Sequence, residues 1–296
     1  MRILFIGGGN RNSLADHFIK YGAEIFAYEY DINAPIKTVA TIITGLMWAD
    51  ADINDDILSV CDRNNIDLVI PLQDAAVKIV ARLPLNAPVS NEYVSGVCLD
   101  KKLFGDWAMD NIKYCYPAVT EVTKTVIDKP RCGFASRGIQ IKPAYESGIK
   151  DMARQAYVDG TEYSADAYFN KPGELIGAVV RKRLIIKGGE VTKSETIDRD
   201  TEVYNKIFDI IRDVGQKMPL AGPFCFQFIE DKDKAVFIIE INARFGGGSI
   251  LSLEAGFDMV KFIVDEYIDL KPVIPNNNWK EGLGMSRYMV ETFYDR

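Results

Sequence analysis

The segment from Gly222 to Gly248 reads GPFCFQFIEDKDKAVFIIEINARFGGG. Two apolar runs of strand length, Pro223–Ile229 and Ala235–Ile241, flank the charged tetrad Asp231–Lys234. Apolar runs on either side of a short polar turn are typical of a β-hairpin. We therefore predict a hairpin that turns at the centre of this tetrad and whose second strand ends just before a run of consecutive glycines.

The end of this hairpin carries polar residues that we expect on one face. Side chains alternate along a strand, so Glu240, Asn242 and Arg244 share a face. The predicted turn pairs Glu240 with Cys225, and Gln227 then joins that face. Carboxylate and amide oxygens suit Mg²⁺, which is often shared with nucleotide phosphates, and the guanidinium suits a phosphoryl group. The alternative interpretation is a solvated sheet edge.

These residues resemble the metal-binding hairpin of the ATP-grasp superfamily, in the style of carbamoyl-phosphate synthase large chains. The shared pattern is Gln, a hairpin, and then Glu-x-Asn-x-Arg. The resemblance implies that Gln227, Glu240 and Asn242 bind Mg²⁺, or Mn²⁺ in its place, together with ATP. It also implies that Arg244 contacts the phosphoryl group that is transferred.

Composition excludes several other classes of protein. The chain has 296 residues, 48% hydrophobic content and a net charge of −7, and this acidic balance argues against a nucleic-acid partner. No apolar run approaches the ~20 residues of a membrane span, and the N-terminal run is too short for a signal peptide. One histidine and five scattered cysteines argue against structural zinc and a disulfide framework. We therefore expect a cytoplasmic protein without a membrane partner.

The first third alternates between strand-like and helical segments, which predicts a parallel, doubly wound sheet. Gly7 and Gly9 match the start of a dinucleotide fingerprint, but Asn12 stands where its third glycine belongs, so we favour a tight turn. We expect Asn12 or Ser13 to cap the first helix. Asp74 follows a strand, where such sheets bind ligands, but a plain N-cap is the preferred interpretation. Strands are expected at 2–7, 24–30, 39–44 and 66–72, and helices at 14–21, 54–61 and 73–83.

The middle of the chain supplies candidates for phosphate binding. Asp100 is a good N-cap, and Lys101 lies in the first helical turn, where the helix dipole disfavours a cation unless an anion binds. Lys129 ends a strand-like run before a Gly/Ser loop, so the lysine and the loop amides can hold phosphates from two sides. The loop resembles the ATP-grasp segment K-P-x-x-G-x-x-S-x-G. Its matching residues are Lys129, Gly133, Ser136 and Gly138.

The stretch from Gln155 to Ser164 resembles the ATP-grasp hinge strand. The resemblance implies that adenine meets the chain at Gln155, Tyr157 and Val158, and that Glu162 binds the ribose hydroxyls. The family usually has a strand and a full helix between the Gly/Ser loop and this hinge, whereas this chain has a shorter segment there. The alternatives are a solvated lysine at Lys101 and an exposed strand residue at Glu162.

The last half is expected to form an antiparallel meander followed by helices. Arg181 and Arg183 share a strand face and suit a carboxylate or acyl phosphate, although a solvated strand face explains them equally well. The apolar spacing predicts a core helix over 202–217. A further helix is expected at 251–270 and a final strand at 282–293. The meander strands are expected at 163–170, 175–187 and 190–197.

Together these features predict an α/β chain: a Rossmann-like parallel-sheet domain at 1–88, followed by a two-lobed α+β ATP-grasp unit with antiparallel sheets. The unit divides into a central subdomain at 89–156 with a shortened phosphate-loop lid and a C-terminal subdomain at 157–296 with the metal site. The resemblance implies a ligase that activates a small-molecule carboxylate as an acyl phosphate for attack by an amine or another nucleophile, as a monomer or a homo-oligomer. Its catalytic residues would be Arg244 and Lys129.

Two alternatives stay open. One is an enzyme similar to a single half of carbamoyl-phosphate synthase, which would phosphorylate bicarbonate or carbamate. The other is a nucleotide-binding regulatory protein without turnover, which the short lid segment favours.

Overall fold

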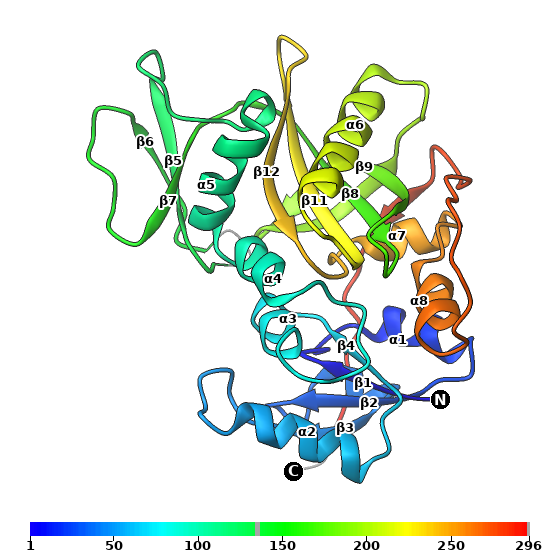
Figure 1. Ribbon diagram of the computed structural model, residues 1–296. Helices are drawn as coiled ribbons and strands as arrows, with labels where there is room; N and C mark the ends of the chain where they lie inside the picture. Colours follow the sequence, from blue (N-terminus) through cyan, green and yellow to red (C-terminus); the bar gives the residue numbers. More distant parts are fainter. Residues whose placement is uncertain (134–136, 295–296) are drawn as a thin grey trace.

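A computed structural model describes residues 1–133 and 137–294, and three β-sheets organise them (Figure 1). The N-terminal sheet is parallel, and each of the other two is antiparallel. This arrangement confirms the predicted fold class. No helix of the described residues is long and apolar enough to cross a membrane.

The N-terminal sheet has the strand order β3-β2-β1-β4 and is covered on both faces. Alternate residues of β1 point to opposite sides, so Ile3 and Phe5 belong to one buried cluster with α1, and Leu4 and Ile6 to another with α2 and α3. Helix α1 begins after Arg11, which makes no capping bond, so the expected Asn12 or Ser13 cap is wrong. The elements are β1 Arg2–Ile6, α1 Asn12–Ile19, β2 Glu24–Glu29, the 3-10 turn Pro35–Thr38, β3 Thr41–Thr44, α2 Ile53–Arg63, β4 Leu68–Pro71 and α3 Asp74–Val80.

The central part combines two helices with a small sheet of order β6-β5-β7. Helix α5 lies against β7, and the sheet projects from the body of the molecule (Figure 1). Between β6 and β7 the chain forms a turn without a helix, as the short segment predicted. The elements are α4 Glu92–Leu99, α5 Lys101–Asn111, the 3-10 turn Lys113–Cys115, β5 Thr125–Pro130, β6 Gln140–Pro143 and β7 Met152–Ala156.

The C-terminal sheet has the order β12-β11-β8-β9-β10-β13. Its apolar face packs on α6, whose residues Ile207, Ile211 and Val214 share one buried cluster with Phe226 and Phe228 of β11. The predicted meander and core helix are therefore confirmed. The elements are β8 Gly160–Phe169, β9 Leu175–Lys187, β10 Glu190–Thr196, α6 Glu202–Lys217, β11 Gly222–Asp231, β12 Val236–Asn242, α7 Ser249–Glu254, α8 Met259–Tyr267 and β13 Gly284–Ser286.

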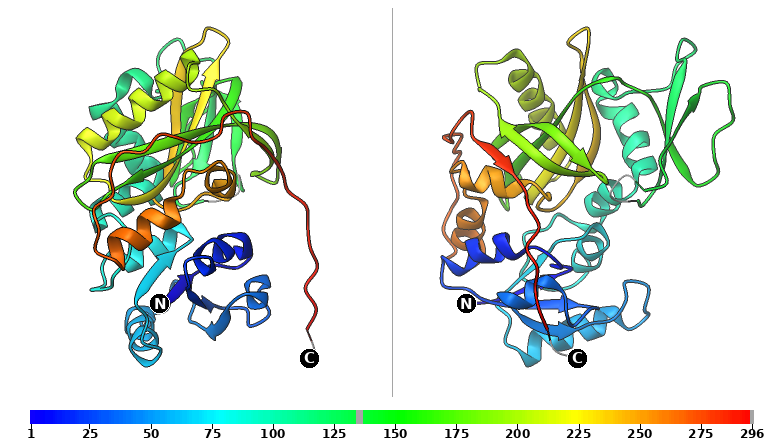
Figure 2. Two further views of the ribbon diagram at one scale, coloured as in Figure 1. Left: turned by 90° about the vertical axis from the view of Figure 1, so that its right-hand side faces the viewer. Right: turned by 180° about the vertical axis from the view of Figure 1, so that it is seen from behind.

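Two expected elements near the C-terminus are wrong in extent. The helix predicted over 251–270 is interrupted, because Gly256 has φ of +99° and separates α7 from α8. The strand predicted over 282–293 is confined to Gly284–Ser286, where it pairs with β10 at the sheet edge. Beyond β13 the chain continues as an extended segment, which both views of Figure 2 show.

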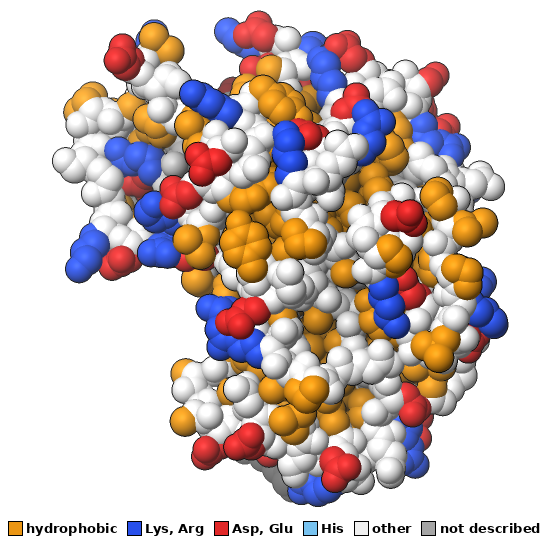
Figure 3. Space-filling model, viewed as in Figure 1, with side chains coloured by type: hydrophobic (Ala, Val, Ile, Leu, Met, Phe, Trp, Pro, Cys, Tyr) orange, Lys and Arg blue, Asp and Glu red, His pale blue; other side chains and the backbone are white. Residues whose placement is uncertain are grey.

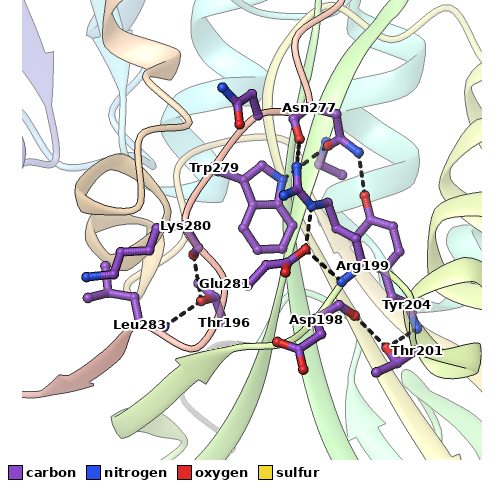
Figure 4. A network of polar contacts seen from close by, with 12 residues as sticks. Thr196, Asp198, Arg199, Thr201, Tyr204, Asn277, Trp279, Lys280, Glu281 and Leu283 are labelled. Atoms are coloured by element: carbon purple, nitrogen blue, oxygen red, sulfur yellow. Dashed lines mark hydrogen bonds and ion pairs between the residues drawn. The ribbon is translucent and has the colours of Figure 1, made fainter.

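The segment before β13 is fixed to the sheet by a polar network (Figure 4). Arg199 donates to Glu281 Oε1 at 2.6 Å and to the backbone oxygen of Asn277, and it stacks over the Trp279 ring at 5.0 Å. Asn277 in turn donates to the Tyr204 hydroxyl of α6 at 2.7 Å. This network holds the chain that leads to β13 in a defined path.

The N-terminal domain contacts the C-terminal part through α1. Phe18 meets Phe245 edge-on at 6.5 Å, and the Tyr21 hydroxyl donates to Asp258 at 2.5 Å. Both buried faces belong to one continuous core. The segment that follows the predicted hairpin is therefore packed directly against the first helix of the chain.

Candidate nucleotide and metal site

The hairpin of β11 and β12 has a different register from the predicted one. Gln227 pairs with Glu240, and Cys225 pairs with Asn242, so the predicted pairing of Glu240 with Cys225 is wrong. The register differs by two residues for two reasons. The turn is shifted by one, because Glu230 pairs with Val236 and not with Ala235, and a β-bulge adds the second, because Phe228 pairs with Ile238 and Ile239 has no partner on β11. Together they set Gln227 directly opposite Glu240.

One face of four adjacent strands carries the polar side chains. On β11 and β12, Gln227, Glu240 and Asn242 lie opposite the buried face formed by the phenylalanines of β11. Strands β8 and β9 extend this polar face in register beside β11. The additional polar residues on it are Glu162, Ser164 and Asp166 of β8 and Arg181 and Arg183 of β9.

Lys101 crosses from α5 to the hairpin. Its Nζ lies 3.1 Å from Glu240 Oε1 and donates to the backbone oxygen of Gly133 at 2.7 Å. The helix start that positions it is the predicted one, because Asp100 accepts from the backbone amides of Lys102 and Leu103. Lys101 thus joins the β11–β12 hairpin to the first part of the Gly/Ser loop.

Lys129 on β5 is buried next to the same groups, with 6% of its surface exposed. Burial lowers the pKa of this lysine, the Glu240 and Glu162 carboxylates raise it, and Lys101 lowers it. Four charged side chains, from α5, β5, β8 and β12, therefore interact electrostatically. Two of them are cations from the central part of the chain, and two are anions from the C-terminal sheet.

Arg183 connects the predicted ribose residue to the predicted metal ligands. Its Nη1 donates to Glu162 Oε2 at 2.6 Å and to Gln227 Oε1 at 3.5 Å. The buried Nε of Arg183 has no hydrogen-bond partner in the described residues. A buried N–H group without an acceptor leaves a position for a bound polar group or a water molecule. Sequence reasoning did not distinguish Arg183 from a solvated residue.

Gln155 and its neighbours link the small sheet to the large one. The buried Gln155 side chain donates to the Tyr116 hydroxyl at 3.1 Å and to the backbone oxygen of Ile239 at 3.3 Å. Its Oε1 lacks a partner in the described part of the chain, so a ligand with a hydrogen-bond donor fits there. Tyr157, which is exposed, and Val158, which is half-buried, lie between β7 and β8.

The Gly/Ser loop connects β5 to β6. Gly138 has φ of +72°, a left-handed conformation that favours glycine, and the backbone oxygen of Gly133 accepts from Lys101. The third predicted loop residue, Ser136, lies outside the described residues. The structure thus places two of the three loop residues beside the strand that carries Lys129.

Arg244 contacts the N-terminal domain. Its Nε and Nη2 donate to the two carboxylate oxygens of Asp74 at 2.9 and 2.7 Å, and Nη2 also lies 3.2 Å from Asn242 Oδ1. Burial is the largest single influence and lowers the pKa of Arg244, but the charge and hydrogen bond of Asp74, together with Cys225 and Glu240, outweigh it and the pKa is raised. The preferred N-cap interpretation of Asp74 is wrong, because Gln73 occupies the N-cap of α3.

The glycine-rich segment that follows requires small residues for steric reasons. A Cβ on Gly246 would lie 2.6 Å from Cys225 Sγ, and one on Gly248 would lie 2.4 Å from Arg181 Nη1. Arg181 itself is buried and paired with Asp166, which also accepts from Ser249 and Ser252. This network, which sequence reasoning missed, ties the start of α7 to the polar face of the sheet.

The oxygen atoms of three side chains suit a hard cation, but this set of ligands alone would bind the cation only weakly. Gln227, Glu240 and Asn242 offer one carboxylate and two amides, and each oxygen faces a cationic side chain: Arg183, Lys101 and Arg244 respectively. The described residues contain no cluster of three or more His, Cys, Asp or Glu side chains that could hold a metal. Mg²⁺ bound here would therefore depend on additional phosphate oxygens.

A surface groove lies away from these residues. It is a groove of about 690 Å³ between α3, α4 and α5, and none of the predicted site residues lines it. The space-filling view shows a recess at this level, between the small sheet and the N-terminal domain (Figure 3).

Comparisons with known proteins define the class. Among solved structures, the fold resembles the biotin carboxylase domain of 2-oxoglutarate carboxylase from Hydrogenobacter thermophilus, solved with MgADP and bicarbonate (TM-score 0.75, 12% identity, covering 96% of this chain and 73% of that one). N5-carboxyaminoimidazole synthetase from Staphylococcus aureus, solved with ADP, has a TM-score of 0.71 and 14% identity, and the match covers 95% of this chain and 78% of that one. L-amino acid ligase from Bacillus licheniformis has a TM-score of 0.71 and 15% identity, and the match covers 92% of this chain and 75% of that one. The chain therefore has the fold of ATP-dependent carboxylate ligases of the ATP-grasp type.

Family comparison agrees with this class. Residues 149–289 match a family described as "ATP-grasp in the biosynthetic pathway with Ter operon", and residues 3–87 match the "PylC-like, N-terminal domain". A comparison with curated proteins found no match. The C-terminal part of the chain therefore matches an ATP-grasp family, and the chain as a whole shares the fold of the solved structures above.

Proposed function

We propose that this protein is a Mg-ATP-dependent ligase that activates a carboxylate as an acyl phosphate for attack by an amine or another nucleophile. One observation carries the proposal. Lys101 Nζ lies 3.1 Å from Glu240 Oε1, the Glu240 carboxylate also favours the charged form of the buried Lys129, and Glu240 stands beside Gln227 on the hairpin. Cations that face a carboxylate–amide set across a boundary between two sheets suit a metal-bound triphosphate.

The proposed roles follow from these positions. Gln227, Glu240 and Asn242 would hold Mg²⁺, with Mn²⁺ as an alternative ion, and the metal would neutralise phosphate charge. Lys101, Lys129 and the loop of Gly133, Ser136 and Gly138 would bind the phosphates. Gln155, Tyr157 and Val158 would meet adenine, and Glu162 would bind ribose.

The chemistry needs charge neutralisation and positioning more than a protein nucleophile. A substrate carboxylate oxygen bonds to the γ-phosphorus while the bond from that phosphorus to the bridging oxygen of ADP breaks. The amine nitrogen then bonds to the acyl carbon, loses a proton and displaces phosphate. Arg244 and Lys129 are the proposed catalytic residues, because their fixed positive charges would stabilise the transferred group.

A second candidate is a nucleotide-binding regulatory protein without turnover. The turn that replaces a helix between β6 and β7 supports it, because less chain is available to cover the phosphates. A single-half relative of carbamoyl-phosphate synthase, acting on bicarbonate or carbamate, is the third. Release of ADP from Mg-ATP in the presence of pooled amino acids and small carboxylates separates an enzyme from the regulator. The regulator would bind Mg-ATP but release no ADP.

We also propose the division into domains at 1–88, 89–156 and 157–296, and a cytoplasmic location, which the five free cysteines support. Small-molecule carboxylates and amines are the proposed substrates. Assembly of identical chains is compatible with this function and is part of the proposal.

The decisive experiment replaces Glu240. Glu240→Gln keeps the shape but removes the charge that faces Lys101 and the proposed metal. We expect Mg-dependent binding of a non-hydrolysable ATP analogue, measured by calorimetry, to weaken about a hundredfold, because a charged hydrogen bond and a metal ligand are lost together. Asp233→Asn, at the exposed turn of the same hairpin, is the matched control and should bind normally. Unchanged affinity in Glu240→Gln would refute the site.

A further inference from the structure

A small cavity lies where the N-terminal domain meets the glycine-rich segment. Its volume is about 30 Å³, which is space for a single small functional group. It adjoins Phe245, the residue directly after Arg244 in the chain. The residues that matter for its chemistry are Arg11, Ser13, Gly246, Gly247 and Arg287.

Two arginines from opposite ends of the chain flank this cavity. Arg11, before α1, donates from Nη1 to the backbone oxygen of Gly246 at 3.0 Å. Arg287, just after β13, donates from Nη2 to the backbone oxygen of Gly247 at 2.5 Å. A Cβ built on Gly247 would lie 3.7 Å from Nη1 of each arginine, so both guanidinium groups approach the same point.

The charges around the cavity do not balance. Arg287 pairs with Glu190 at 3.4 Å, and Arg244 pairs with Asp74. Arg11 forms no ion pair with any residue that the structure describes, and its guanidinium donates to the backbone oxygen of Gly246. Burial, together with repulsion from Arg244 and Arg287, lowers the pKa of Arg11 to about 10. A bound anion would offset this repulsion.

We propose that Arg11 and Arg287 bind an anchoring carboxylate of the substrate, distinct from the group that reacts. A carboxylate matches the fork of a guanidinium and the small cavity. Its oxygens would be occupied by charged donors, so it would be a poor nucleophile and would serve to hold the molecule. The inference rests on the proposed ligase function. It identifies the substrate class as molecules with a carboxylate besides the reacting group, such as an amino acid that offers its amine or a dicarboxylate.

The test measures substrate binding separately from nucleotide binding. The full chain is loaded with Mg²⁺ and a non-hydrolysable ATP analogue and titrated with L-alanine, L-glutamate, succinate and L-alaninamide. We expect at least one of the three carboxylates to bind and L-alaninamide not to bind. Arg11→Ala should weaken the carboxylate about ten- to hundredfold, since a charged hydrogen-bond pair is lost, with the affinity for the ATP analogue unchanged.

Further variants test whether the loss of binding belongs to this cavity. Arg82→Ala, which removes an exposed arginine paired with Glu92 on the surface, should bind the carboxylate normally. Arg287→Gln should weaken it as Arg11→Ala does, and thermal melting checks that each variant is folded. If Arg11→Ala does not fold, Arg11→Lys, which keeps the charge but loses the fork, replaces it and should bind more weakly than the wild type.

Three results would overturn the inference: no carboxylate of the set binds the loaded wild-type protein, the arginine variants bind as the wild type does, or inorganic phosphate takes the site in preference to every carboxylate. Failure of the wild-type protein to bind the ATP analogue would instead refute the proposed ligase function, so the two failures are distinguishable.

Discussion

At the scale of single residues, the position of Lys129 sets its chemistry. The side chain is buried, its pKa is lowered mainly by that burial, and the nearby Glu240 and Glu162 favour its charged form. Nucleotide phosphates would supply the additional negative charge that a buried ammonium lacks. Lys182, on strand β9 of the six-stranded sheet, is half-buried and lies on the opposite face from Arg181 and Arg183.

This difference predicts the outcome of a pair of substitutions. Lys129→Ala should weaken binding of Mg-ATP about tenfold to a hundredfold, because a hydrogen bond between charged groups is lost from a buried site. Lys182→Ala, the matched control, should change the affinity less than about twofold, since its charge lies on the other face. Calorimetric titration measures both. A larger loss in Lys182→Ala would show that the phosphates bind elsewhere.

At the scale of elements, the small sheet of β5, β6 and β7 is joined through one carboxylate. Asp128 on β5 accepts from Arg154 of β7 at 2.8 and 2.9 Å and lies 3.0 Å from Lys142 of β6. Hydrogen bonds from Arg154 are the largest cause of a lowered pKa for Asp128, and Lys142 lowers it as well. The residue before the proposed phosphate-binding lysine therefore connects all three strands.

The sign of the pH effect follows from this shift. A carboxyl whose pKa is lower in the folded state than its unfolded value of about 3.9 stabilises the fold fully above that value. The stabilisation is lost as pH falls through the folded pKa. We expect protection of the backbone amides of β5–β7 against hydrogen exchange to fall below about pH 4.

Asp128→Asn tests this expectation. It should reduce the stability of the small sheet at neutral pH by about 2–3 kcal/mol, toward the low end for a broken buried pair because Arg154 keeps some contact with water. It should also remove the acid dependence of exchange in these strands. Glu121→Gln, an exposed acid before β5, is the control. An acid dependence that persists in Asp128→Asn would assign it to another group.

Sequence reasoning succeeded for elements with a clear period of apolar residues or with clear capping and turn residues at their ends. The parallel sheet, the meander, α6 and the cap at Asp100 follow local rules of apolar spacing and capping. The partner of Glu240 was wrong by two residues: the turn is shifted by one, and a bulge at Ile239, which leaves no signal in an apolar run, adds the second. The final strand was predicted too long, because its extent depends on whether β10 offers a partner and not on its own apolar residues.

At the scale of the whole molecule, local patterns could not reveal contacts between distant segments. Arg11, Asp74 and Arg287 are ordinary polar residues in the sequence, and they gain a role from Gly246, Arg244 and Gly247 far along the chain. The candidate site residues that were predicted lie in short motifs, whereas those that were missed gain their role from contacts between distant segments, either within the C-terminal sheet or between it and the N-terminal part. These long-range contacts are therefore the part of the site that only the three-dimensional structure could supply.

The contact between Asp74 and Arg244 gives the domain interface a proposed role in turnover. The N-terminal domain holds Arg244 through two hydrogen bonds, so it fixes the guanidinium against which the transferred phosphoryl group would be placed. Asp74→Asn keeps one acceptor but loses the paired charge. Because positioning of charge is the main source of catalysis in phosphoryl transfer, we expect ADP release to slow about ten- to hundredfold.

Binding of the ATP analogue should be unchanged within about twofold in Asp74→Asn, since the proposed nucleotide ligands come from other elements. Asp67→Asn is the control at the opposite end of β4, where its carboxylate accepts from the backbone amide of Arg2 at 2.7 Å. Steady-state ADP release and calorimetry measure the two quantities. If Asp74→Asn lowered nucleotide affinity and left the rate at saturation unchanged, Asp74 would support nucleotide binding, and the domain contact would not position Arg244 for transfer.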